Sequence, residues 1–116
     1  MFNWFRKNDK SKSPDFSTIE SIDSAIGQYK NGNLAKMYLF PLEFGGVDDA
    51  SNVLYAPHFA VDMKQSFDRI VMKLLEDGFK IKYSGTPNYK GNSFVPSSLV
   101  LKVSGDRTFE EIINIW

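Results

Sequence analysis

Apolar residues recur at helical spacing in two parts of the chain, and the stronger of the two patterns covers residues 59–80. Its apolar positions, three and four residues apart, are Met63, Phe67, Ile70, Val71 and Leu74. This spacing predicts an amphipathic helix with one buried stripe. The charged residues between these positions, Lys64 among them, are expected on the solvated faces. Gly78 is expected to end the helix in the left-handed conformation.

The weaker helical pattern covers residues 16–33. Its apolar positions are Ile19, Ile22, Ile26 and Tyr29. Ser17 and Glu20 have the spacing of a capping box, which predicts that the helix begins after Ser17. Gly32 is placed to act as the first residue beyond its C-terminus. We expect this narrow helix to cover an edge of the domain.

Four segments have the composition of β-strands. Residues 34–42 are apolar on both faces and predict a central strand that ends at Pro41. Residues 79–84 and 98–104 alternate between apolar and polar positions, and a turn at 104–107 leads into residues 108–116. This last segment suits either a helix or a strand, and the preceding turn favours a closing strand. Residues 53–55 could form a short edge strand.

The predicted element order is α-β-α-β-β-β. We therefore expect an α+β fold in which residues 15–116 form a single domain, with an antiparallel sheet of about four strands and two helices packed on it. A length of 116 residues suits one domain, and 42% hydrophobic residues provide enough apolar material for one core. Residues 1–14 are expected to be a basic, frayed N-terminal segment.

Charge and cysteine content narrow the function classes. The whole chain carries 14 basic and 14 acidic residues, so it offers no excess positive field for nucleic acid. Residues 1–12 hold four cations and one anion (+3), which leaves ten cations and thirteen anions (−3) in residues 13–116. The chain has no cysteine and no apolar run long enough to cross a bilayer. We expect a cytoplasmic protein without stable membrane association, although the aromatic and basic residues 2–10 would also suit a membrane surface.

No group of residues in the sequence requires a particular reaction. His58 is the single histidine, and Glu43, Asp48 and Asp49 precede it in an irregular region. The carboxylate oxygens of these three residues and the imidazole of His58 are possible ligands for a divalent ion. Adjacent aspartates in a loop, however, usually remain solvated. No serine lies in a nucleophile motif. We therefore expect no catalytic residue, no metal and no cofactor.

Two loops are candidates for binding. Residues 43–58 form the longest irregular region, and long loops in small domains often carry recognition surfaces. Residues 87–97, PNYKGNSFVPS, combine turn formers with aromatic residues. Their simpler interpretation is a structural corner, with Tyr89 and Lys90 at its tip as possible contacts. Together the two loops could also form the pocket of a small enzyme or ligand-binding domain.

Three sequence stretches are similar to a known class of protein. FPLEFGG, NYKGNSFVPS and INIW lie within residues 34–116, which resemble small bacterial immunity proteins of polymorphic toxin and contact-dependent growth inhibition systems. The resemblance implies a protein that binds the toxic C-terminal domain of an effector, often a nuclease, and covers its active site. It implies no catalysis by the immunity protein itself.

The resemblance provides no interface motif, so the candidate contacts come from residue chemistry. A nuclease usually presents a basic groove, which the carboxylates of residues 43–58 would suit. Exposed aromatic and charged side chains are typical anchors of protein interfaces. The candidate toxin-binding residues are Glu43, Asp48, Asp49, Tyr55, Tyr89 and Lys90. The expected partner is the cognate toxin domain, and the alternative is the small enzyme or ligand-binding domain described above.

Overall fold

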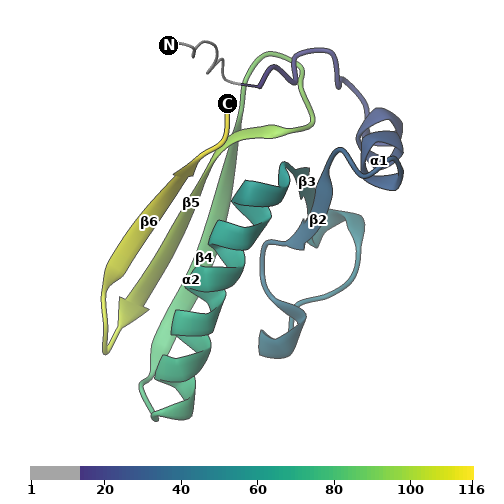
Figure 1. Cartoon of the computed structure of the whole chain (residues 1–116). Coiled ribbons are helices and arrows are strands. Elements are labelled where there is room, and N and C mark those ends of the chain that lie inside the picture. Colours follow the sequence, from purple (N-terminus) through teal and green to yellow (C-terminus); the bar gives the residue numbers. More distant parts are fainter. Residues whose placement is uncertain (1–13) are drawn as a thin grey trace, which may run out of the picture.

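A computed structural model describes residues 14–116 and shows an α+β fold in one small domain (Figure 1). The predicted fold class is therefore confirmed, although the strands form two antiparallel sheets where one was expected. Residues 1–13, with the predicted basic segment, lie outside the described part of the chain. The elements are α1 (Ile22–Lys30), β2 (Ala35–Tyr38), β3 (Val53–Ala56), α2 (His58–Glu76), β4 (Ile81–Tyr89), β5 (Pro96–Gly105) and β6 (Phe109–Asn114).

The larger sheet has the strand order β4-β5-β6, and both pairs of strands are antiparallel. Its inner face carries alternate residues of each strand, such as Leu99, Leu101 and Ile113, which are completely buried. Helix α2 lies across this face, between β6 and the smaller sheet (Figure 1). The core therefore lies between α2 and the inner face of the sheet. Residues 108–116, which suited helix or strand, contain the closing strand β6.

Helix α2 has the predicted position, but its buried stripe differs from the predicted one. Met63 and Ile70 are 39% and 53% exposed, whereas Lys64, expected in solvent, is 1% exposed. Lys64 is buried because it lies on the same face as Phe67 and Val71, at intervals of three and four residues. Gly78 follows the helix with φ +90°, as predicted.

Within residues 14–116 the smaller sheet consists of β2 and β3, with Ala35 opposite Ala56 and Tyr38 opposite Val53. The prediction that residues 34–42 form a central strand was wrong, because β2 pairs with one strand in this part of the chain. The predicted short strand near residues 53–55 is confirmed as β3.

Helix α1 packs beside β3 and buries Ala25, so the larger sheet carries one helix and not two. Its N-cap is Ser21, whose side chain accepts a hydrogen bond from the Ser24 amide at 3.0 Å. The predicted cap at Ser17 was wrong, since the Ser17 amide instead donates to the Asp15 side chain in a preceding turn. Gly32 adopts φ +82° just beyond the helix, as predicted.

The 87–97 segment is a corner between two strands. Strand β4 continues through Tyr89, with a register shift next to Asn88, and β5 begins at Pro96. Gly91 has a positive φ of 53°, and Val95 is completely buried in the core. Among residues 14–116, no helix combines the length and the apolar character needed to cross a membrane.

Candidate functional site

The segment from Phe40 to Asn52, which we call the 40–52 loop, presents apolar and acidic side chains together. The side chains of Phe40, Leu42 and Val47 are 38%, 42% and 55% exposed. The exposed acidic residues of the same loop are Glu43, Asp48 and Asp49. An apolar centre with charged residues around it is the usual composition of a protein-binding surface.

One buried side chain holds the two ends and the middle of this loop together. The Asn52 side-chain oxygen accepts a hydrogen bond from the Phe40 amide at 2.8 Å. Its Nδ2 donates to the carbonyl oxygens of Phe40 and Val47, both at 2.9 Å. Asn52 is 7% exposed, so these bonds form largely out of contact with water. The loop therefore has a defined shape before any partner arrives.

Adjacent glycines make the tight turn at the start of the loop possible. Residues 42–44 form one turn of 3₁₀ helix, which Gly45 ends with φ +100°. A Cβ atom on Gly46 would lie 2.0 Å from the Phe40 carbonyl oxygen. Only glycine fits at this close backbone approach. The pair Gly45 and Gly46 thus lets the chain turn back onto the backbone of Phe40 and Pro41.

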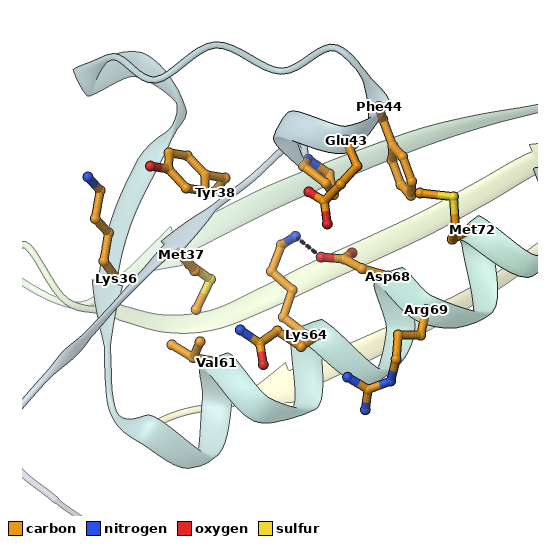
Figure 2. A pocket seen from close by; sticks show the side chains of 12 residues that line it. Lys36, Met37, Tyr38, Glu43, Phe44, Val61, Lys64, Asp68, Arg69 and Met72 are labelled. Atoms are coloured by element: carbon orange, nitrogen blue, oxygen red, sulfur yellow. Dashed lines mark hydrogen bonds and ion pairs between the residues drawn. The ribbon is translucent and has the colours of Figure 1, made fainter.

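The three carboxylates have different neighbours. Asp49 caps the 3₁₀ turn Ala50–Asn52, because its side chain accepts hydrogen bonds from the Ser51 amide and hydroxyl. Asp48 lies 3.6 Å from the Lys36 ammonium in an exposed ion pair. Glu43 lies on the 3₁₀ turn and points toward α2 (Figure 2). Asp49 therefore has a structural role, while Glu43 and Asp48 present charge to the surface.

A cleft of about 370 Å³ separates the 40–52 loop and β2 from α2 (Figure 2). Glu43 and Phe44 form the loop side, and Lys36 and Tyr38 extend from β2. The α2 side is lined by Val61, Lys64, Gln65, Asp68, Arg69 and Met72. The cleft thus borders the exposed loop directly.

Lys64 and Asp68 form a buried ion pair at the floor of this cleft. The Lys64 ammonium donates to Asp68 Oδ2 at 2.8 Å, and the Tyr83 hydroxyl donates to Asp68 Oδ1. The side chains of the pair are 2% and 20% exposed. The Lys64 ammonium also lies 5.5 Å from the centre of the Tyr83 ring. Within residues 14–116, Asp68 is the single hydrogen-bond acceptor of Lys64.

Burial shifts the pKa values of both Lys64 and Tyr83. It lowers the pKa of Lys64, while the hydrogen bond and charge of Asp68 and the charge of Glu43 partly oppose the decrease. Burial, together with the donated hydrogen bond to Asp68, strongly raises the pKa of Tyr83. Burial therefore disfavours the charged form of Lys64, whereas Asp68 and Glu43 favour it.

The remaining candidate contacts lie on other elements. Tyr55, on β3, is half-buried and packs against Tyr29 at 5.5 Å between ring centres. Tyr89 is 46% exposed at the end of β4. Lys90 lies 4.8 Å from the ring centre of Trp116, at the corner between β4 and β5. Tyr55 is the strand partner of Lys36, which pairs with Asp48, whereas Tyr89 and Lys90 lie at the separate β4–β5 corner. Of the six predicted residues, Glu43 and Asp48 on the loop are the best defined.

The structure also limits the predicted enzyme pocket. His58 Nε2 lies 3.0 Å from the Gly32 carbonyl oxygen, so the described contacts pair it with backbone and not with a carboxylate. Of the two predicted pocket loops, the first lines the cleft, and no residue of 87–97 does. No group of three or more metal-binding side chains comes together within residues 14–116.

Sequence reasoning missed Asn52 and Lys64. Asn52 was one polar residue in an irregular region, and nothing in the sequence distinguishes it from its neighbours. The burial of Lys64 was detectable in principle from its spacing. It is four residues from both Ala60 and Asp68 and three residues from Phe67, so all four lie on one helical face. No family model matches the chain, and no curated protein matches it significantly.

Proposed function

We propose that the protein is an immunity protein that binds and neutralises a bacterial toxin domain through the 40–52 loop. The observation that carries the proposal is the preformed arrangement of this loop, which exposes Phe40, Leu42 and Val47 beside Glu43 and Asp48. The function requires no catalysis by the protein itself. The sequence resemblance stated above supports the same class.

Preorganisation favours binding because less conformational freedom is lost when the partner docks. In this loop the ordering is already supplied by the three hydrogen bonds of Asn52 and by the Gly45–Gly46 turn. Apolar side chains would supply most of the binding free energy, and the carboxylates would orient the partner.

Charge indicates the kind of toxin surface that fits. The exposed carboxylates of the loop and the net charge of −3 on residues 13–116 favour a basic partner surface. A nuclease presents such a surface where it holds phosphates. The proposed partner is therefore a nuclease domain whose phosphate-binding groove is covered by the 40–52 loop.

The experiment is co-expression of the full chain with the C-terminal toxin domain of a secreted effector, taken from the upstream gene if that gene encodes one. Rescue of growth and a co-purifying complex are expected with the unaltered chain. Val47→Arg and Asp48→Lys should each weaken both, because they place positive charge on an exposed part of the loop. Ser104→Arg, an exposed change on β5, is the matched control and should retain rescue. Absence of both rescue and complex with the unaltered chain would refute the proposal.

A second candidate function is supported by the cleft. Lys64 has two N–H groups without an acceptor among the described residues, and they are buried beside a cavity of about 370 Å³. A small ligand with a hydrogen-bond acceptor would satisfy them. Thermal unfolding with a panel of small carboxylates and amides tests this function. Stabilisation by a panel member that disappears in Lys64→Met supports it, and no shift with any member counts against it.

A further inference from the structure

We infer that strand β6 is an interface for a second copy of this chain, which pairs with it antiparallel and joins two three-stranded sheets into one of six strands. Strand β6 is an edge of its sheet, since its one partner among residues 14–116 is β5. An edge strand presents unpaired backbone donors and acceptors that another strand can bind. This inference is independent of the proposed toxin binding.

The two edges of the sheet differ in their protection against pairing. Strand β4 contains Pro87, Lys82 and a register shift next to Asn88, which are features that prevent strand addition. Strand β6 has the sequence FEEIIN, without proline, glycine or lysine, and it pairs with β5 in regular register. The charged residues of β6 are Glu110 and Glu111, and it has no proline or register shift, so β6 is the less protected of the two edges.

The sequence of β6 selects one self-pairing register. Residues directly opposite in an antiparallel pair lie on the same face of the sheet. The two-fold axis of a self-paired strand therefore lies between the two copies of one residue, which are directly opposite each other. An axis at Glu110 or Glu111 would place like charges opposite each other. An axis at Ile112 places Glu110 opposite Asn114 and Glu111 opposite Ile113, and it pairs more of the strand than an axis at Ile113. The favoured register is centred on Ile112.

The outer face of the sheet would gain a continuous apolar row in this register. Ile112 is 53% exposed and lies opposite Val100 on β5. Across the joined strands, this pairing places Val100 and Ile112 of one copy in a row with Ile112 and Val100 of the second copy. Cross-strand pairs of β-branched residues stabilise sheets.

The other face of the sheet adds an apolar flank of α2. Phe59, Met63 and Ile70 are 44%, 39% and 53% exposed, and their spacing places them on one side of the helix. That side is opposite the one with Gln65 and Met72, which faces the cleft. Figure 1 shows α2 between β6 and β2, so this flank lies on the β6 side. In the pair, the two flanks would face each other above the joined strands.

Sedimentation equilibrium of the full chain over a concentration series tests the interface. The unaltered chain should reach twice the monomer mass as concentration rises. Ile112→Lys should remain monomeric because it places two ammonium groups opposite each other. Ile112→Thr, which keeps a β-branched residue, should dimerise more weakly. Thr86→Lys, an exposed change on the same outer face of β4, is the matched control and should dimerise normally. A monomer throughout the series for the unaltered chain would overturn the inference.

Single cysteines test the register, because the chain contains none of its own. Ile112→Cys should form a covalent dimer on mild oxidation, since the two thiols lie opposite each other. Glu110→Cys should not, since four residues separate it from its copy along the strand direction, about 13 Å. Equal cross-linking of both variants would contradict the proposed register even where dimers form.

Discussion

Two lysine–aspartate pairs with the same spacing, one within α2 and one at its C-terminal end, lie in different surroundings. Lys64 donates to Asp68 at 2.8 Å with side chains 2% and 20% exposed. Lys73 donates to Asp77 at 2.9 Å with side chains 70% and 44% exposed. Because spacing and distance are matched, the two pairs differ in burial and in the additional hydrogen bond that Asp68 accepts from Tyr83. We therefore expect that breaking the buried pair costs far more stability than breaking the exposed pair.

The largest expected effect is that of Asp68→Ala. It leaves the Lys64 ammonium buried without its acceptor, and we expect the free energy of unfolding to fall by about 3–5 kcal/mol. Asp77→Ala is the matched control and should change it by less than about 0.5 kcal/mol. Urea unfolding followed by circular dichroism measures both. Equal losses in the two variants would show that burial does not distinguish the pairs.

The next pair of variants separates two contributions to the free energy of unfolding: the cost of leaving the Lys64 charge unpaired and the net stabilisation from the Lys64–Asp68 ion pair. Asp68→Asn keeps an acceptor for Tyr83 but leaves Lys64 charged, so it should destabilise by about 2–3 kcal/mol. Adding Lys64→Met removes that charge and keeps an apolar side chain of similar length. The double variant should regain most of the loss, because buried ion pairs are often replaced without net cost. If the double variant is no more stable than Asp68→Asn alone, the unpaired charge is not the cause.

These two pairs also show how far the sequence predicted the structure. The element order followed from periodicity and turn residues, so α2, β4, β5 and the helix ends at Gly32 and Gly78 were predicted correctly. The burial of Lys64 was not, because K-x-x-x-D occurs both within α2 and across its C-terminal end, and periodicity gives a charged residue the solvated face by default. Which pair becomes buried depends on β2 and Tyr83, which pack against α2 from other parts of the chain.

The candidate site was predicted only in part for a similar reason. The acidic character of the 40–52 loop could be read from Glu43, Asp48 and Asp49 directly. Its shape could not, since it depends on Asn52, which bonds backbone atoms of Phe40 twelve residues away. Hydrogen bonds between distant segments leave no periodic signal in the sequence.

A smaller effect tests the third member of the buried group. Tyr83→Phe removes the hydroxyl that donates to Asp68 and should cost about 1.5 kcal/mol at neutral pH. The pKa of Tyr83 is raised above its ordinary value of 10.0, so the folded protein retains this proton better than the unfolded chain. The stability from this hydroxyl is therefore complete below pH 10.0 and is lost as pH rises above it.

The difference between the unaltered protein and Tyr83→Phe should accordingly shrink above pH 10.0. The lowered pKa of Lys64 has the opposite effect, because it makes stability rise with pH until the ordinary lysine value of 10.5 is reached. Lys64 is present in both proteins, so its contribution cancels in the difference between them. Urea unfolding at a series of pH values measures the difference. A constant difference across the series would contradict the role assigned to the Tyr83 proton.

The smallest expected effect concerns the exposed pair. Lys73→Ala should change the free energy of unfolding by no more than about 0.5 kcal/mol, because solvent screens the attraction and the long side chain loses conformational freedom in the pair. Any such effect should disappear in concentrated sodium chloride, whereas the loss caused by Asp68→Ala should persist, since buried charges are screened much less. Urea is the required denaturant, because guanidinium would itself screen both pairs. If salt abolishes the Asp68→Ala loss as well, solvent reaches Lys64 and the distinction between the two pairs fails.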